Sequence, residues 1–494
     1  MDIKFNVKKQ QEKIRNPWNF GVNTCHAFLW TRNDLNKHAR VSSKECGFRY
    51  VRFHNIISRQ TGVYSEDENG TPQINFEKFD VIIDNIIACD YIPYLEISFC
   101  PDALSDELNE MCYYKANASV PNSFEKWSYL ITKIIEHIIE RYGLNFAKKM
   151  YFEVWNEPDL PFLRGDMEDY FRLYDYTVTA IKSVNSELRV GGPATSKCEW
   201  IEDFVKHIEK GSEITDGKPV PCDFISTHAY PSDLPFLNSD YGADVTLQES
   251  NIMYQLFKNV KDIVESSTLK GLPIIMGEWN SSAGPLVFNH DEKNNGAFII
   301  KTCNDLKDII DGSLYWNMSD IYEEVDFHYI PFHGGYGIIN VNDIPKSSFH
   351  AFSMLNKITG NEVCAAYDKE DANVRALAAY DNENNIFKIL LYYYKEPTID
   401  NSETENITVS VSGIESKSIS AEFEMVNDEG GSAYEWWRKI GSPQFINSEN
   451  LDFLLEKSKP INYKEPVFID KTNGDYKFNM TFAPGDFALI TLKI

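Results

Sequence analysis

Two glutamates have the sequence surroundings expected of a catalytic carboxylate pair. Glu157 lies in W-N-E-P at 155–158, and Glu278 lies in G-E-W-N at 277–280. Hydrolysis of a glycosidic bond with retention of configuration needs two carboxyl groups about 5–5.5 Å apart, one protonated and one ionised. We therefore predict that Glu157 is the general acid/base and Glu278 the nucleophile, with the Glu278 charge raising the pKa of Glu157. A single glutamate at a strand end more often forms a salt bridge, but two such contexts in one chain favour catalysis.

Other side chains suited to a sugar site lie at the ends of predicted strands. Acids, histidines, an asparagine and tryptophans gather there, and Asn156 is placed to hydrogen-bond a sugar 2-OH. The residues at these ends are Arg52, His54, Trp155, Asn156, Glu157, His228, Tyr230, Glu278, Trp279, Asn280, Trp316, Asp320, Glu323 and Glu324.

The elements that must bring these residues together are predicted from the alternation of apolar strands with amphipathic helices. Helical patterns occur at 76–88 and 124–143, among others. The pattern favours an α/β fold, a (β/α)8 TIM barrel over 15–345, in which the carboxyl ends of all strands meet on one face. A doubly wound sheet is the alternative, but it predicts glycine-rich phosphate turns that the sequence lacks. The eight predicted strands are 20–25, 48–54, 91–98, 149–157, 188–193, 222–230, 272–280 and 312–320.

A second domain is predicted beyond about residue 350, where the periodicity changes. Residues 387–394, 407–413 and 487–494 alternate as half-buried strands. We predict a C-terminal β-sandwich accessory domain over 346–494, to which residues 1–14 add a strand. Short helices are expected at 432–441 and 447–458, and Trp436 and Trp437 are expected in the sandwich core.

Composition disfavours several classes of partner. The 74 acidic and 48 basic side chains give a formal charge of −26, which repels phosphate backbones and anionic membranes. The nine cysteines form no C-x-x-C pair or metal-spaced cluster, and the first residues lack an apolar signal core. We therefore expect no nucleic-acid or membrane partner, no metal, no cofactor and a cytoplasmic location, while a homo-oligomer stays possible.

The chain resembles glycoside hydrolase family 39, which includes β-xylosidases and α-L-iduronidases, and is more similar to the bacterial β-xylosidase branch. The family's acid/base segment, F-E-[IV]-W-N-E-P-[ND], is matched by FEVWNEPD at 152–159. Its nucleophile segment, E-[YW]-N-[TS]-S, is matched by EWNSS at 278–282. Further matches are VRFHN at 51–55, RVGGPA at 189–194, YWNMSDIYEE at 315–324, FHGGYGIIN at 332–340 and AYEWWRKIGSP at 433–443.

The resemblance also implies which residues line the sugar subsite. Asn280 and His333 are further candidates for substrate contact, and Glu324 is left open. Two positions depart from the family pattern: His54 is followed by Asn55 rather than glycine, and the nucleophile by Trp279 rather than the usual tyrosine. We expect both to lie close to the sugar. The implied subsite residues are His54, Asn156, His228, Tyr230, Trp316 and Glu323.

These features together predict a retaining, exo-acting β-xylosidase for short xylo-oligosaccharides. Other specificities within the family, namely galactoside, glucoside, arabinoside or iduronide cleavage, are the alternatives. Iduronide would need cations for its carboxylate; residues 226–233 supply none, although Arg59 and Arg164 are possible donors. A sugar-binding protein without catalysis is disfavoured, because binding alone does not require two facing carboxylates.

Overall fold

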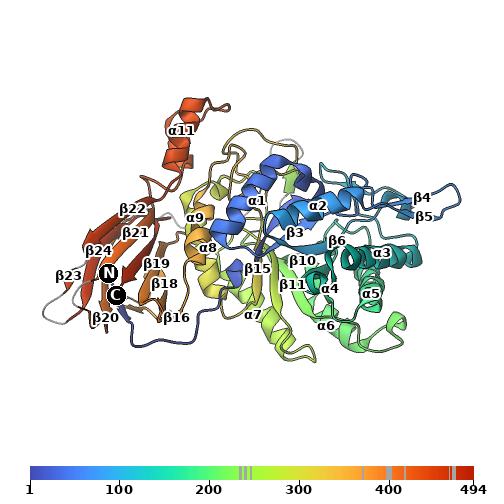
Figure 1. The fold of residues 1–494 in the computed structure, drawn as a ribbon, viewed down its shortest axis with the longest axis horizontal. Helices are drawn as coiled ribbons and strands as arrows, with labels where there is room; N and C mark the ends of the chain where they lie inside the picture. Colours follow the sequence, from blue (N-terminus) through green and yellow to red (C-terminus); the bar gives the residue numbers. More distant parts are fainter. Residues whose placement is uncertain are drawn as a thin grey trace.

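A computed structural model describes residues 1–494 apart from 233–235, 239–241, 245–246, 370–371, 397–402, 417–418, 467 and 470–473. Eight parallel strands close into a barrel in the order β10-β11-β14-β15-β2-β3-β6-β9, so the TIM barrel is confirmed (Figure 1). Each strand falls on a predicted apolar run. The strands are β2 (Gly21–His26), β3 (Tyr50–His54), β6 (Ile92–Ile97), β9 (Tyr151–Val154), β10 (Arg189–Thr195), β11 (Phe224–Ala229), β14 (Ile274–Trp279) and β15 (Gly312–Tyr315).

Helices cover the outside of the barrel, and their sequences explain their bounds. In α3 (Phe124–Tyr142), apolar residues at three- and four-residue steps face the core, Ser123 caps the first turn through the Lys126 amide, and Gly143 follows the last turn. The other helices of this layer are α1 (Asn33–Cys46), α2 (Glu77–Ala88), α5 (Met167–Val184), α6 (Ile201–Lys210), α7 (Asn251–Glu265) and α8 (Lys293–Leu306). The short α4 (Leu144–Ala147) follows α3.

The helical layer of the barrel continues past residue 345, where we predicted the boundary with the sandwich domain. Helix α9 (Ser347–Asn356) packs against α1 and α8, and almost all of its side chains are buried. The helix therefore completes the barrel after β15, and residues 347–356 pack as part of the barrel layer.

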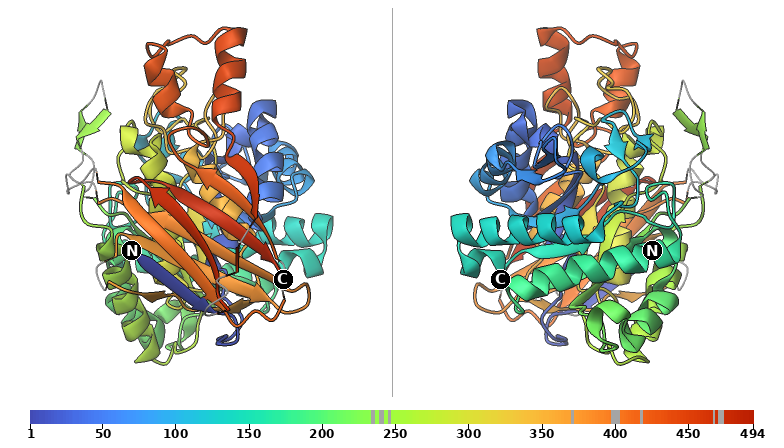
Figure 2. Two further views of the ribbon diagram at one scale, coloured as in Figure 1. Left: turned by 90° about the vertical axis from the view of Figure 1, so that its left-hand side faces the viewer. Right: turned by 90° about the vertical axis from the view of Figure 1, so that its right-hand side faces the viewer.

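Two sheets, antiparallel except for the pairing of β1 with β20, form the C-terminal sandwich. The first has the order β17-β1-β20-β24-β23 and the second β16-β18-β19-β25-β21-β22, with an apolar core between them. Strand β1 (Asp2–Asn6) runs parallel to β20, so the N-terminus lies among strands from the end of the chain (Figure 2). The other strands are β16 (Asn361–Glu362), β17 (Ala366–Tyr367), β18 (Val374–Asp381), β19 (Ile386–Tyr393), β20 (Glu405–Ser412), β21 (Ser420–Val426), β22 (Ile461–Pro466), β23 (Phe468–Ile469), β24 (Tyr476–Phe482) and β25 (Phe487–Lys493).

The two predicted short helices are present as α10 (Tyr434–Lys439) and α11 (Ser448–Lys457), and α11 projects from the body of the molecule (Figure 1). Trp437 packs with Phe332 and Tyr434 in a small cluster of its own, and Trp436 lies at the edge of that cluster. The prediction that both tryptophans belong to the sandwich core was therefore wrong. Within the described residues, we find no helix with the length and apolar character needed to span a bilayer.

Candidate active site

A cavity of about 380 Å³ opens at the carboxyl ends of the barrel strands, where the β→α loops converge. Six of the predicted residues line it: His54, Asn156, Glu157, Tyr230, Glu278 and Trp316. Loops add aromatic and apolar walls and three charged groups. These further lining residues are Met111, Cys112, Leu160, Pro161, Phe162, Arg164, Ser196, Lys197, Ala283, Pro285, Tyr322, Glu324, Val325 and Tyr336.

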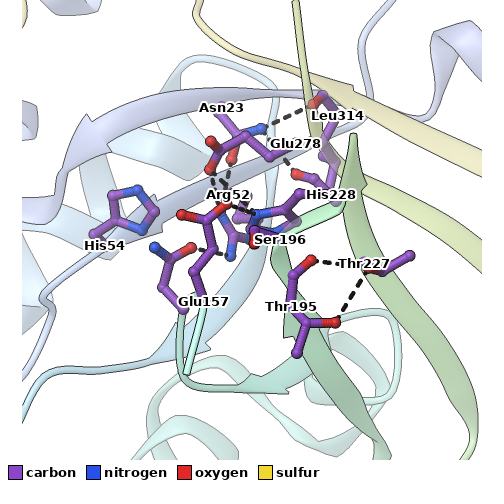
Figure 3. A network of polar contacts seen from close by, with 12 residues as sticks. Asn23, Arg52, His54, Glu157, Thr195, Ser196, Thr227, His228, Glu278 and Leu314 are labelled. Atoms are coloured by element: carbon purple, nitrogen blue, oxygen red, sulfur yellow. Dashed lines mark hydrogen bonds and ion pairs between the residues drawn. The ribbon is translucent and has the colours of Figure 1, made fainter. Parts of the chain in front are cut away.

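The two predicted catalytic glutamates lie close together in this cavity (Figure 3). Glu278 is near the end of β14, and Glu157 follows β9. An oxygen of each carboxylate and a ring nitrogen of His228 all lie within 4.8 Å of one another. Carboxylate oxygens this close fit the about 5–5.5 Å spacing of a covalent double displacement better than the about 6.5–9.5 Å that leaves room for an attacking water.

The backbone after β9 turns sharply to present Glu157. Trp155 has φ 69° and Glu157 has φ 40°, both in the left-handed region that side chains with a Cβ seldom occupy. Such a conformation costs on the order of 1–3 kcal/mol and persists only where the surroundings hold it. The Glu157 amide donates to Ala194 O at 2.9 Å, and the Trp155 indole donates to Phe162 O at 2.9 Å.

The environment separates the protonation states of the two carboxyls. Burial, together with the charges of Asp159 and Glu324, raises the pKa of Glu157 to about 8. Burial raises the pKa of Glu278 to about 7, where the charge of Glu157 adds to the rise and Arg52 opposes it. Glu157 therefore keeps its proton to higher pH than Glu278. The main cause at Glu157 is desolvation, and not the Glu278 charge that we had predicted.

A fully buried arginine organises the floor of the site. Arg52 Nε donates to Glu153 Oε2 at 2.6 Å, and its Nη2 donates to Asn156 Oδ1 at 2.9 Å. Its guanidinium also lies 2.8 Å from Glu96 and 3.4 Å from Glu278. Asn156 thus uses its oxygen on Arg52, which leaves its amide hydrogens for a ligand. A buried cation is expected to stabilise several buried carboxylates at once.

Sequence reasoning missed Glu96 and Glu153 as parts of this floor. Both are completely buried inside apolar strands, β6 and β9. An acidic residue in such a strand is rare unless it is paired. That signal was present in the sequence segments 91–98 and 149–157.

Hydrogen bonds to buried carboxylates position His54 and Tyr230. His54 Nδ1 lies 2.6 Å from Glu96 Oε2, while its Nε2 has no hydrogen-bond partner among the described residues. The Tyr230 hydroxyl donates to Glu278 Oε1 at 2.5 Å. Trp316 packs beside His54, with ring centroids 4.9 Å apart. A buried ring nitrogen without a partner is available to a substrate hydroxyl.

The structure places Glu324, and not Glu323, at the cavity. Glu323 lies 2.9 Å from His26 Nε2 and 3.7 Å from Arg32, and it does not line the cavity. Glu324 lines the cavity, accepts a hydrogen bond from the Tyr322 hydroxyl, and lies 3.7 Å from His54 Nε2. The segment after β15 is irregular, so the sequence alone did not show which of two adjacent glutamates turns inward.

Three other predicted residues lie outside the cavity lining. Asn280 is buried and donates to the Trp316 and Tyr336 carbonyls, so it supports the loops behind the site. His228 is buried behind the pair, with Nδ1 3.0 Å from Glu157 Oε1 and 3.9 Å from Glu278 Oε2. His333 lies 2.7 Å from Ile330 O through Nδ1 and does not line the cavity.

The two positions that depart from the family pattern also lie away from the cavity lining. Trp279 packs outward against Phe298, Tyr315 and Phe352, since adjacent side chains of a strand point to opposite faces. Asn55 is buried beside Ser98, and the backbone N–H of Asn55 donates to the Ser98 hydroxyl at 3.3 Å. The expectation that both lie close to the sugar was wrong.

Of the two arginines considered for a uronate carboxylate, one reaches the cavity. Arg59 is paired with Asp102 and Glu110, each at 2.8 Å. Arg164 lines the rim of the cavity together with Lys197.

Comparison with known proteins agrees with this geometry. A family model described as "Glycosyl hydrolases family 39" matches residues 1–474. A curated "Beta-xylosidase" from Caldicellulosiruptor saccharolyticus is 34% identical over 496 residues, which cover 100% of this chain and 98% of the relative. A second "Beta-xylosidase", from Geobacillus stearothermophilus, is 33% identical over 90% of this chain and 86% of its own length.

Among solved structures, a monomeric beta-xylosidase from Caulobacter crescentus CB15 superposes with a TM-score of 0.89 at 28% identity, and the match covers 100% of this chain and 99% of that one. The family match, the two full-length relatives and the shared architecture all lead to the same assignment. The chain therefore belongs to glycosyl hydrolase family 39 and is a glycoside hydrolase.

Proposed function

We propose that the protein is a retaining, exo-acting β-xylosidase that removes xylose from the non-reducing ends of short xylo-oligosaccharides. The observation that carries this proposal is the approach of Glu157 and Glu278 to within 4.8 Å in one cavity. The two full-length relatives that carry the name "Beta-xylosidase" support the choice of sugar. Arg52 and its buried carboxylate partners fill the floor of the cavity. This supports cleavage at the end of a sugar chain over cleavage within it.

The reaction follows from the two protonation states. Ionised Glu278 attacks the anomeric carbon while Glu157 gives its proton to the departing glycosidic oxygen, which forms a glycosyl ester on Glu278. Glu157, now ionised, takes a proton from water as the water oxygen attacks the same carbon. This step releases xylose with its original configuration, and both carboxyls return to their starting states.

The groups around the pair would each assist this chemistry. Arg52 and the Tyr230 hydroxyl favour the ionised form of Glu278 before the attack. The amide of Asn156 is free to donate to the sugar 2-OH, a contact that strengthens in the oxocarbenium-like transition state. His54 Nε2 and Glu324 would bind other hydroxyls of the same sugar.

Iduronide cleavage remains the second candidate, because Arg164 and Lys197 stand at the cavity rim. Hydrolysis of nitrophenyl β-xyloside, β-glucoside, β-galactoside, α-arabinoside and α-iduronide, compared by kcat/KM, distinguishes the specificities. We expect the xyloside to be the fastest. A negligible rate on the xyloside beside a fast rate on another glycoside would overturn the choice of sugar and leave the retaining mechanism open to its own tests.

We also propose a cytoplasmic location, where imported oligomers would be the substrates. All nine cysteines are free thiols in the structure, which supports a reducing compartment. Fractionation of the native cells with an antibody against the protein tests this. Detection in the medium alone would contradict it.

A further inference from the structure

A buried ion cluster lies behind one wall of the active-site cavity. Lys346 Nζ lies 2.6 Å from Asp291 Oδ1 and 2.7 Å from Asp320 Oδ2, and all three side chains are completely buried. Asp291 precedes α8, Asp320 follows β15, and Lys346 precedes α9, so the cluster joins three loops of the barrel. None of the three residues lines the cavity.

The cluster holds the backbone of one short segment, 334–337, within the motif FHGGYGIIN. Each member makes one bond to this segment. The bonds run from the Gly334 amide to Asp291 Oδ2 at 2.6 Å, from Lys346 Nζ to Gly335 O at 2.9 Å, and from the Gly337 amide to Asp320 Oδ1 at 2.7 Å.

Glycine is required where the segment touches the cluster. A Cβ on Gly335 would lie 2.4 Å from Asp320 Oδ1, and one on Gly337 would lie 2.2 Å from the Asp320 amide nitrogen. The backbone can approach the buried carboxylate this closely only without side chains. Gly335 and Gly337 of the motif are thus explained by this contact.

The one large side chain of the segment, Tyr336, faces the active site. Tyr336 lines the cavity that holds Glu278, and its hydroxyl donates to Ala283 O at 2.7 Å on the loop after β14. Its ring contacts Tyr322, with centroids 5.4 Å apart, and lies 6.3 Å from that of Trp316. The bonds of the cluster on either side of Tyr336 therefore help to hold this wall of the cavity, beside the bond from Asn280 to the Tyr336 carbonyl.

We propose that Lys346 is a positioning residue for the active site, acting through Asp291 and Asp320 on the Tyr336 wall. Lys346 neutralises one of two buried carboxylates, which keeps both in place as acceptors for the Gly334 and Gly337 amides. Loss of one partner from such a buried cluster leaves an unpaired charge that the site must hydrate or expel. This proposal depends on the proposed function in one respect, because it takes Tyr336 to be part of the sugar subsite.

The test is a double-mutant cycle between Lys346 and Tyr336. We expect Lys346→Met to lower kcat/KM by about tenfold or more on the best aryl glycoside of the wild type, and the same change in a Tyr336→Ala background to lower it less than about threefold. If Lys346→Met lowers kcat/KM by the same factor with and without Tyr336, Lys346 acts on the fold alone, and this result would overturn the proposal.

Lys293→Met is the matched control. Lys293 also bridges two aspartates, at 2.5 Å from Asp428 and 2.6 Å from Asp486, but these lie where the barrel meets the sandwich. We expect this variant to lose thermal stability and to keep kcat/KM within about twofold of the wild type. An equal kinetic loss in both lysine variants would contradict a specific role for Lys346.

Two further measurements keep the test decisive if Lys346→Met folds poorly or the sugar assignment fails. Asp320→Asn leaves one charge-balanced Lys–Asp pair, and its kinetic loss should also shrink when Tyr336 is absent. In protein labelled with 3-fluorotyrosine, the ¹⁹F signal that disappears in Tyr336→Phe should shift in Asp320→Asn and stay fixed in Lys293→Met. This second readout needs no activity, and an unmoved Tyr336 signal would overturn the proposal.

Discussion

The Tyr230 hydroxyl lies 2.5 Å from Oε1 of Glu278 and donates to it inside the buried cavity. A hydrogen bond from a phenol is stronger to an ionised carboxylate than to a neutral one, so it favours the form of Glu278 that can attack carbon. The bond opposes the burial that raises the pKa of Glu278 to about 7. Tyr230 therefore helps to keep Glu278, the proposed nucleophile, charged at neutral pH.

Tyr230→Phe should move the acidic limb of the pH profile to higher pH. In the wild type, kcat/KM should rise as the pair loses its first proton near pH 7 and fall as it loses the second near pH 8. Without the phenol, the pKa of Glu278 rises, so a higher pH is needed before the nucleophile ionises. Initial rates at low substrate concentration across pH 5–9 measure the shift, and an unchanged acidic limb would contradict this role.

Glu278→Ala should lose turnover by several orders of magnitude while the fold is kept, because no other group can form the glycosyl ester. The alanine leaves space beside the anomeric carbon for a small anion. Added azide should therefore give a glycosyl azide of inverted configuration, which NMR identifies. Wild-type activity in this variant would show that the nucleophile is another residue.

Glu157→Ala should discriminate between leaving groups. General acid catalysis contributes about 10²–10⁴-fold where the departing oxygen needs a proton. We expect a loss of this size on xylobiose and a much smaller loss in the first step with 2,4-dinitrophenyl β-xyloside, whose leaving group departs unprotonated. Pre-steady-state release of dinitrophenol measures that step. Equal losses on both substrates would count against the acid role.

Glu324 and Glu323 form a natural pair of test and control. Glu324→Gln should lower kcat/KM by about tenfold or more, because a hydrogen bond from a sugar hydroxyl to a charged group contributes about 1.5–3 kcal/mol. Glu323→Gln disturbs only the contacts to His26 and Arg32 outside the cavity, so kcat/KM should stay within about threefold. The reverse order of effects would restore the prediction made from sequence.

The barrel and its carboxylate pair could be predicted from sequence because their signals are local. Each of the eight barrel strands overlaps a predicted run, and side chains at the carboxyl ends of parallel strands must meet on one face. Glu157 and Glu278 were singled out by their strand-end positions together with the W-N-E-P and G-E-W-N segments around them. Alternation along β14 could also have placed Trp279 outward, on the face opposite Glu278.

The features that could not be predicted lie in irregular segments, where no helix or strand periodicity gives the direction of a side chain. After β15 the chain is irregular, and packing alone turned Glu324 inward and left Glu323 with His26. The same holds for Asp291, Asp320 and Lys346, which are distant in sequence and come together in one buried cluster. Periodicity was enough to predict the strands and the meeting of the two carboxylates, since regular elements repeat a side-chain direction. The wall of the cavity depends on contacts between loops, whose side-chain directions follow no repeat.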